Sequence, residues 1–201
     1  MSRVFLVRHG DTDANSRERF WGKTDVGLSP AGVAQAGRLR DRLAAEKIDA
    51  IYSSRLKRAR HTAEIIASRQ AVPVVACDEL CEINFGELEG LAFAEINQRY
   101  PKLTGSWARR DPDLTYPGGD NLKEFSRRVI TFLPRLEKHA AEETILIVAH
   151  SGVLRTLLCQ MLGIDLERRW QFRTDLASLS IVDVHPPEAV LTRLNDLCHL
   201  D

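Results

Sequence analysis

Two histidines that follow apolar runs are the residues of this 201-residue chain that point most directly to chemistry. Arg8 and His9 come directly after the run 4–7, and His150 comes directly after the run 145–149. If both runs are strands of a parallel sheet, their carboxyl ends meet at one edge, where open α/β sheets place their sites. A neutral imidazole is a nucleophile that can form a covalent intermediate, and the planar arginine fork matches phosphate oxygens. The two positions therefore predict a site for a phosphoryl group.

The same residues also have ordinary structural uses. Histidines such as His9 and His150 can simply be hydrogen-bonded side chains at strand ends. Thr12 and Asn15 follow in the turn after His9, and both residue types are also common in turns and caps. Which use applies depends on whether further phosphate-binding groups occur in suitable places along the chain.

Apolar runs alternate with helical periodicity and predict the elements that position these residues. Strand signals lie at 3–8, 48–53, 73–76, 144–149, 177–184 and 189–195. Helical stripes begin near residues 30, 55, 121 and 153, and the third is expected to run to Leu136. Continuous apolar runs are typical of strands covered on both faces. The order predicts a three-layer α/β/α sandwich with a mainly parallel sheet and an antiparallel edge strand, formed by a hairpin turn at 185–188.

The stretch 84–120 has weaker periodicity and many aromatic residues. We expect a single domain, 1–201, in which 84–120 is a lid-like helical insertion over the site, with short helices near 92–99 and 103–110. Four aromatic residues either line the entrance for the substrate or belong to the local core, since both uses are common: Phe20, Trp21, Trp107 and Tyr116.

Five segments in order resemble the motifs of one family. Segments 8–15, 22–29, 53–63, 82–90 and 148–152 are similar to motifs of the histidine phosphatase superfamily, the phosphoglycerate mutase-like proteins, and the match covers nearly the whole chain. The departures are few. Leu88 stands where the family often has tryptophan, and Ser151 where it often has a second glycine.

The resemblance implies a role for each matching residue. Taken alone, Arg58 could be a solvated cation on a helix, and Glu82 could be a carboxylate that caps one. The catalytic residues that the resemblance implies are His9, Glu82, Arg8, Arg58 and His150. The phosphate-binding residues that it implies are Arg8, Thr12, Asn15, Gly22, Arg58, His150 and Ser151. His9 would become phosphorylated and Glu82 would donate a proton. No metal and no cofactor is implied, because cationic side chains take the place of magnesium.

The activity implied is hydrolysis of a small phosphomonoester through a phosphohistidine. Segments 170–175, 178–181 and 190–195 look like those of α-ribazole phosphatases, which act late in cobalamin nucleotide-loop assembly. A broad-specificity sugar or metabolite phosphatase and a phosphoglycerate mutase are alternatives. Mutases are typically longer and carry His-Tyr-Gly where this chain has 84–86, Asn-Phe-Gly. A phosphate-binding regulatory module is the non-enzyme alternative, and such a protein would be expected to lack a catalytic group.

Composition narrows the choice of partners. Lys and Arg together number 28, as do Asp and Glu, and no block of like charge stands out, so neither nucleic acid nor a membrane surface is indicated. No apolar stretch is long enough to span a membrane, and the first apolar run is too short for a signal peptide. The four cysteines fit reduced, mostly buried thiols and do not complete a zinc site. We expect a cytoplasmic protein with a small-molecule substrate, and a homodimer is left open.

Overall fold

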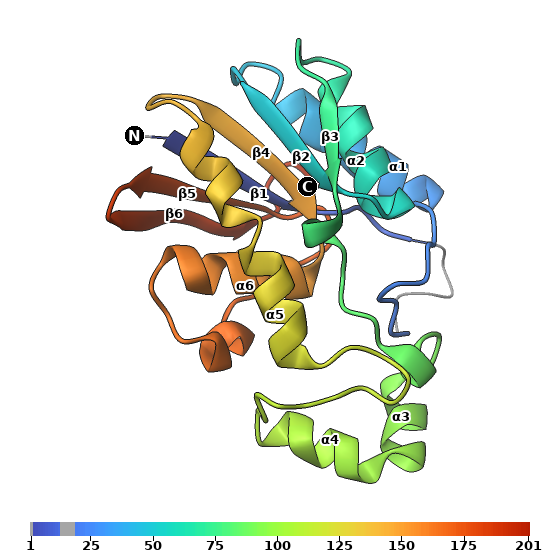
Figure 1. Cartoon of the computed structure of the whole chain (residues 1–201). Coiled ribbons are helices and arrows are strands. Elements are labelled where there is room, and N and C mark those ends of the chain that lie inside the picture. Colours follow the sequence, from blue (N-terminus) through green and yellow to red (C-terminus); the bar gives the residue numbers. More distant parts are fainter. Residues whose placement is uncertain (1, 13–18) are drawn as a thin grey trace.

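A six-stranded sheet runs through the centre of the protein in the computed structural model, which describes residues 2–12 and 19–201 (Figure 1). The strands in chain order are β1 (Ser2–Arg8), β2 (Ala50–Ser54), β3 (Val74–Cys77), β4 (Thr144–Ala149), β5 (Leu179–His185) and β6 (Glu188–Asp196). Their order in the sheet is β3-β2-β4-β1-β5-β6. β1, β2, β3 and β4 pair in parallel, whereas β5 pairs antiparallel with both β1 and β6. The predicted sheet and its hairpin edge are confirmed.

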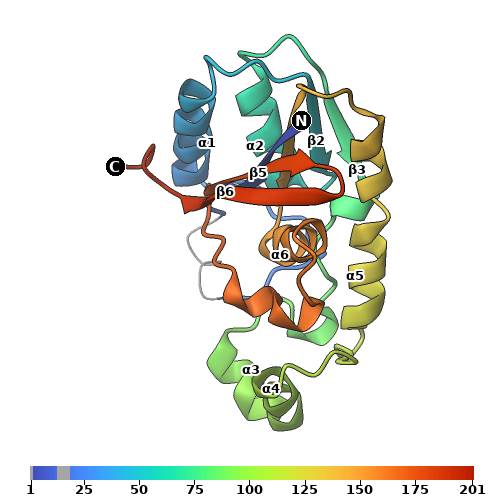
Figure 2. The ribbon, with the colours of Figure 1, turned by 90° about the vertical axis from the view of Figure 1, so that its left-hand side faces the viewer.

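Helices cover both faces of the sheet (Figure 2). The helices in chain order are α1 (Pro30–Arg42), α2 (Lys57–Ala67), α3 (Phe93–Arg99), α4 (Pro101–Ala108), α5 (Leu122–Ile130) and α6 (Ser151–Met161). Phe5 and Val7 of β1 share an apolar core with residues of α1 and α2, while Val4 and Leu6 share another with residues of α5 and α6. Successive side chains of a strand point to opposite faces, so the chain forms the three layers that the sequence predicts.

Capping residues begin two of these helices as the sequence suggests. The Ser29 side chain accepts the backbone N–H of Gly32 at the start of α1, and Asn121 does the same for two N–H groups at the start of α5. The expected continuation of α5 to Leu136 is wrong, because the α-helix ends at Ile130 and a 3₁₀ helix follows at Leu133–Lys138. Pro134 has no N–H to donate to the carbonyl of Ile130.

The segment 84–120 carries α3 and α4, which lie apart from the sheet at the bottom of Figure 1. Backbone hydrogen bonds tie this segment to the chain that follows the first strand. The N–H of Phe20 donates to Leu91 (3.0 Å), and the N–H of Gly90 donates back to Phe20 (2.8 Å). The segment is therefore held directly beside Phe20.

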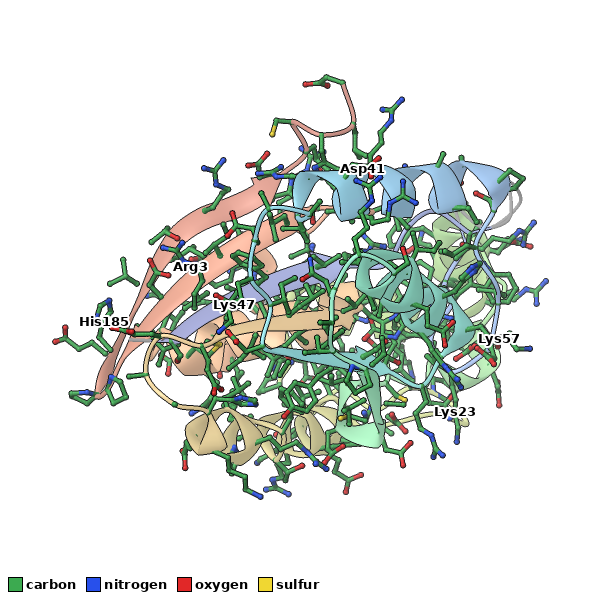
Figure 3. All side chains as sticks on the ribbon, turned by 90° about the horizontal axis from the view of Figure 1, so that it is seen from above. Arg3, Lys23, Asp41, Lys47, Lys57 and His185 are labelled. Atoms are coloured by element: carbon green, nitrogen blue, oxygen red, sulfur yellow. The ribbon has the colours of Figure 1, made fainter. Side chains whose placement is uncertain are left out.

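Charged side chains are spread over the surface (Figure 3). Lys23 and Lys57 lie near the carboxyl ends of the parallel strands, whereas His185 lies at the opposite edge. Within residues 2–12 and 19–201, no helix is long and apolar enough to cross a bilayer. All four cysteines are free: Cys77 and Cys159 are buried, Cys81 is half-buried and Cys198 is exposed.

Candidate active site

A cavity of about 320 Å³ lies where the carboxyl end of β1 meets the start of α6. Six residues that the sequence predicts for the site line it: Arg8, His9, Thr12, Arg58, Glu82 and Ser151. The other residues of the wall are Asp11, Arg19, Phe20, Trp21, Phe85 and Leu176. The fold thus brings together side chains from six separate stretches of the chain.

His9 is held by a hydrogen bond at one ring nitrogen, and within residues 2–12 and 19–201 the other ring nitrogen makes none. Its Nδ1 lies 2.7 Å from the carbonyl oxygen of Gly10, which can only accept, so Nδ1 carries the hydrogen and Nε2 carries the lone pair. Its backbone is bonded on both sides, donating to Ala149 and accepting from Ala177, at 3.0 Å each. The residue is 7 % exposed. This is the tautomer that an attack by Nε2 requires.

Burial is the main reason why the pKa of His9 lies well below its usual value, and the nearby charges of Arg8 and Arg58 lower it further. A low pKa keeps the imidazole neutral at neutral pH. His9 is therefore available as a nucleophile without first losing a proton.

His150 lies beside His9, with ring centroids 5.1 Å apart, and it is buried behind the wall of the cavity rather than part of it. Its Nε2 lies 2.9 Å from the hydroxyl of Ser54. The same hydroxyl accepts the N–H of Leu56 (3.2 Å), so its one proton is donated either to this Nε2 or to the sulfur of Cys81, which lies 3.6 Å away. If Ser54 donates to Nε2, Nδ1 of His150 carries a hydrogen toward the site. Burial, followed by the charge of Arg58, holds the pKa of His150 well below its usual value.

Arg58 on α2 lies inside the protein. It is 1 % exposed, so the alternative of a solvated surface cation is wrong. Its Nη1 donates to the carbonyl of Thr24 (2.9 Å) and its Nη2 to that of Gly22 (2.7 Å). Gly22 is not in the wall of the cavity, and a Cβ there would lie 1.9 Å from the Ile83 carbonyl oxygen. The structure thus places Gly22 where it positions Arg58.

Arg8 is the second arginine of the wall. Its Nη1 donates to the carbonyl of Thr174 (2.8 Å), whose hydroxyl is also hydrogen-bonded to Ser151 (2.7 Å). Burial lowers the pKa of Arg8 to about 10, so the side chain stays charged at neutral pH. Two cations with fixed orientations therefore face the same small volume as His9.

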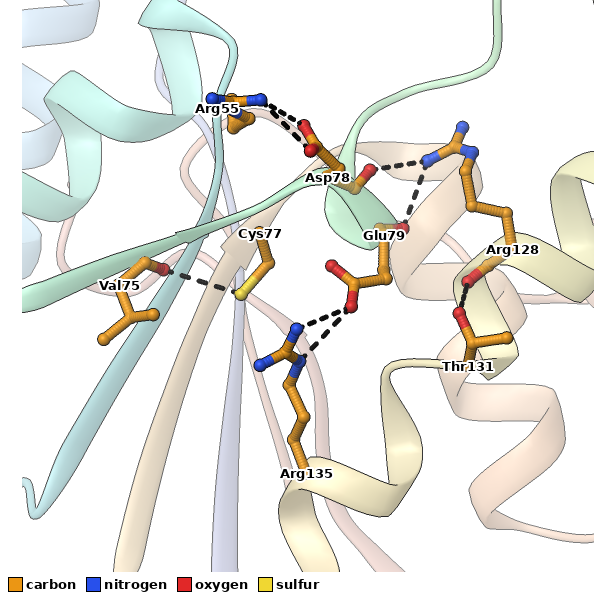
Figure 4. A network of polar contacts seen from close by, with 8 residues as sticks. All are labelled: Arg55, Val75, Cys77, Asp78, Glu79, Arg128, Thr131 and Arg135. Carbon is orange, nitrogen blue, oxygen red and sulfur yellow. Dashed lines mark hydrogen bonds and ion pairs between the residues drawn. The ribbon is translucent and has the colours of Figure 1, made fainter.

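Glu82 lines the same cavity, and its carboxylate is held by backbone hydrogen bonds. Its two carboxylate oxygens accept the N–H groups of Gly152 and Ile83, at 3.0 Å each. Arg128 on α5 donates to three carbonyls just before Glu82, those of Asp78, Glu79 and Cys81, and weakly to Glu82 itself. Figure 4 shows two of these bonds, to the carbonyls of Asp78 and Glu79. Glu82 is 8 % exposed, and its position is set by both backbone and side chain contacts.

Four buried side-chain nitrogens have no hydrogen-bond partner within the described part of the chain. They are Nε of Arg8, Nε1 of Trp21, Nδ1 of His150 and Nε of Arg155. Buried polar groups are almost always paired in folded proteins. Arg8 and Trp21 line this cavity, His150 lies behind its wall, and Arg155 lines a second cavity that adjoins it.

Comparison with known proteins agrees with this geometry. Residues 4–197 match the model of the histidine phosphatase superfamily (branch 1). The chain belongs to that superfamily. Phosphoserine phosphatase 1 of Hydrogenobacter thermophilus is 34 % identical over 200 residues, which cover 100 % of this chain and 95 % of that protein. The adenosylcobalamin/alpha-ribazole phosphatase of Escherichia coli K12 is 32 % identical over 193 residues, covering 96 % and 95 % respectively. These relatives identify the histidine phosphatase described here as a phosphoric monoester hydrolase.

Solved structures of the superfamily share the fold. The crystal structure of the alpha-ribazole phosphatase from Shigella flexneri superposes with a TM-score of 0.88 at 32 % identity, covering 96 % of each chain. The whole arrangement of sheet and helices is therefore that of the phosphoglycerate mutase-like phosphatases.

A second cavity of about 340 Å³ adjoins the first in this histidine phosphatase. The two cavities share four wall residues, Phe20, Glu82, Phe85 and Ser151. The remaining wall residues of the second are Ile83, Phe93, Trp107, Tyr116, Leu122, Phe125, Gly152, Arg155, Arg169 and Trp170. A substrate with its phosphoryl group at His9 can thus extend past Glu82 into the second cavity, whose wall is largely aromatic.

The four aromatic residues singled out in the sequence lie at these cavities. Trp21 lines the first, Trp107 and Tyr116 line the second, and Phe20 lines both. Phe20 stacks on Trp107 with ring centroids 5.3 Å apart, and burial raises the pKa of Tyr116 to about 12. Phe20, Trp107 and Tyr116 also belong to an apolar core of the histidine phosphatase, so these three serve both as wall and as local core.

Some residues of the site fall outside what the sequence predicted. Asn15 lies outside the described residues, so its phosphate-binding role stays a prediction. Gly152 and Arg155 were not predicted to have a functional role. The available signal was helical spacing, since Arg155 lies one turn after Ser151 and residues four apart share a helix face. Within residues 2–12 and 19–201, no group of three histidine, cysteine or acidic side chains is arranged to hold a metal ion.

Proposed function

We propose that this enzyme hydrolyses a small-molecule phosphomonoester through a covalent phosphohistidine at His9, without a metal ion. The observation that carries the proposal is the lone pair on Nε2 of His9, in a cavity that two buried arginines also line. Arginines with fixed orientation stabilise the charge of a transferring phosphoryl group and cost no reorganisation during the reaction.

In the first step, Nε2 of His9 attacks phosphorus, and an N–P bond forms as the bond to the leaving oxygen breaks. Glu82, protonated at this stage, gives its proton to the departing alkoxide. Arg8 and Arg58 bind the non-bridging oxygens, and His150 donates from Nδ1. An alcohol leaves and the phosphohistidine remains.

In the second step, a water molecule attacks phosphorus while Glu82 takes one of its protons. The N–P bond breaks, inorganic phosphate leaves and His9 returns to its neutral form. The same carboxyl group thus acts as an acid and then as a base. It must therefore reach the leaving oxygen in the first step and the oxygen of the attacking water in the second, and both occupy the same side of the phosphorus.

The aromatic cavity supports α-ribazole 5′-phosphate as the substrate, because flat ring systems pack well against aromatic side chains. Phosphoserine is a second candidate, supported by the phosphoserine phosphatase among the relatives. The segment 84–120 supplies Phe85, Trp107 and Tyr116 to the cavity, and we propose that it covers the leaving group as a lid. The four free cysteines support a reducing, cytoplasmic location.

A phosphate-release screen tests the proposal. The esters are α-ribazole 5′-phosphate, phosphoserine, 3-phosphoglycerate and p-nitrophenyl phosphate, each with excess chelator. We expect release of phosphate that the chelator does not reduce, and an acid-labile phosphoenzyme on rapid quenching. His9→Ala should remove both, with a loss of turnover on the order of 10³-fold or more. A phosphoenzyme that persists in His9→Ala would refute the role of His9. Conversion of 3-phosphoglycerate to its 2-isomer in place of phosphate release would favour the mutase alternative.

A further inference from the structure

Arg155 is the unpaired cation of the second cavity. It lies on α6, one turn after Ser151, and its side chain makes no hydrogen bond and no ion pair within the described part of the chain. Its guanidinium lies over the ring of Trp170, 5.7 Å from the centroid. This contact orients the arginine but satisfies none of its N–H donors.

Arg169, the other arginine in the wall of the second cavity, has hydrogen-bond partners. Arg169 donates from Nε to the carbonyl of Leu166 (2.6 Å) and from Nη1 to the hydroxyl of Ser126 (2.8 Å). Arg155 has no comparable partners, and burial lowers its pKa. The buried Nε–H of Arg155 has no partner within the described residues, and leaving such a donor unpaired is costly unless a ligand completes it.

We propose that the leaving alcohol of the substrate carries a carboxylate on an apolar or aromatic body, and that Arg155 binds this carboxylate. The inference rests on the proposed phosphatase activity and selects between its candidate substrates, since phosphoserine carries a carboxylate beyond the ester oxygen and α-ribazole 5′-phosphate does not. Glu82 and Ser151 line both cavities, so a substrate with its phosphoryl group at His9 extends from them toward Arg155.

A carboxylate fits this position better than a second phosphate. The phosphoryl cavity provides three arginines, Arg8, Arg19 and Arg58, and the histidine pair for a doubly charged group. The second cavity offers one unpaired guanidinium in a mostly aromatic wall. One guanidinium matches the single charge of a carboxylate and can bind both of its oxygens.

The test uses two esters of the same shape that differ in charge, 4-carboxyphenyl phosphate and 4-carbamoylphenyl phosphate. We expect wild-type kcat/KM to favour the acid by about 10- to 100-fold, because a hydrogen bond to a charged group is worth that much. Arg155→Met should bring the ratio close to one, and Arg155→Lys should keep part of it. Arg127→Met removes the same charge from an exposed position of α5 and should leave the ratio unchanged.

The outcomes of this experiment distinguish a failure of the inference from a failure of the proposed phosphatase function. Equal kcat/KM for acid and amide in the wild type would overturn the inference and leave the phosphatase mechanism standing. A preference for the acid that survives in Arg155→Met would also overturn it. Absence of phosphate release from these esters and from every ester of the screen would instead overturn the proposed function.

Discussion

Gly152 allows the carboxylate of Glu82 to approach the start of α6, and Gly152→Ala should disrupt this contact. The N–H of Gly152 donates to Oε2 of Glu82 at 3.0 Å. A Cβ at position 152 would lie 2.5 Å from Oε1 of Glu82 and 3.3 Å from Cζ of Phe125. Because Phe125 closes the other side, the carboxylate is the group that must move.

The size of the movement follows from these distances. Ordinary contact begins at 3.4 Å, so the carboxylate must shift by about 0.9 Å (3.4 minus 2.5). A misplacement of about 1 Å at a reacting group costs on the order of 100-fold in rate. Alanine is better than glycine in a helix by up to about 1 kcal/mol, so the fold should not be lost.

The assay compares esters that differ in their need for a proton. An alkyl phosphate needs Glu82 to protonate its leaving oxygen, whereas p-nitrophenolate leaves without a proton. For Gly152→Ala we expect kcat/KM to fall about 100-fold with the alkyl ester, and much less with p-nitrophenyl phosphate. Gly37→Ala in α1, where a Cβ meets no atom within 4 Å, is the control. Equal losses with both esters, or none, would refute the assignment of Glu82 as the acid.

Three further predictions concern the charges around the site and the fold. In Arg8→Met, the pKa of His9 should rise because a positive neighbour that disfavours the imidazolium is gone; an NMR titration measures this, and an unchanged or lower value contradicts it. In Ser54→Ala, His150 loses its hydrogen-bond partner, and the affinity for vanadate should fall about tenfold, as seen in competitive inhibition. Hydrogen bonds from arginines hold the pKa of Asp196 well below its usual range, so the carboxylate stabilises the fold above pH of about 4 and ceases to do so as the pH falls further. Asp196→Asn should therefore lower the free energy of unfolding by about 1–3 kcal/mol at pH 7, and the difference between the two proteins in thermal denaturation should shrink toward pH 3.

Most of the fold was predictable because its strands are continuous apolar runs between clear helical stripes. The end of α5 was not, because the stripe continues through Phe132 although Pro134 stops the helix, and Phe132 stays buried in the turns that follow. Apolar periodicity records which side chains are buried, and it does not record whether the backbone hydrogen bonds continue.

The candidate site was also predictable from the sequence only in part. Arg8 and His9 were predictable from their place at a strand end, and their neighbours in space were not. The contact between Glu82 and Gly152 joins residues 70 positions apart, and local spacing carries no signal for it. Arg155 looks like any cation on a partly exposed helix, and only the structure reveals that its Nε has no hydrogen-bond partner among the described residues.

The hydrogen bonds that join the backbone of His9 to Ala149 and Ala177 have a consequence for the timing of catalysis. His9, the proposed nucleophile, directly follows β1 and is held by these two backbone bonds, so opening of the proposed lid or release of phosphate need not carry it along. Its amide should exchange with solvent deuterium as slowly as those of the sheet interior. A motion that limits turnover would then involve residues on the leaving-group side of the phosphorus, and not His9.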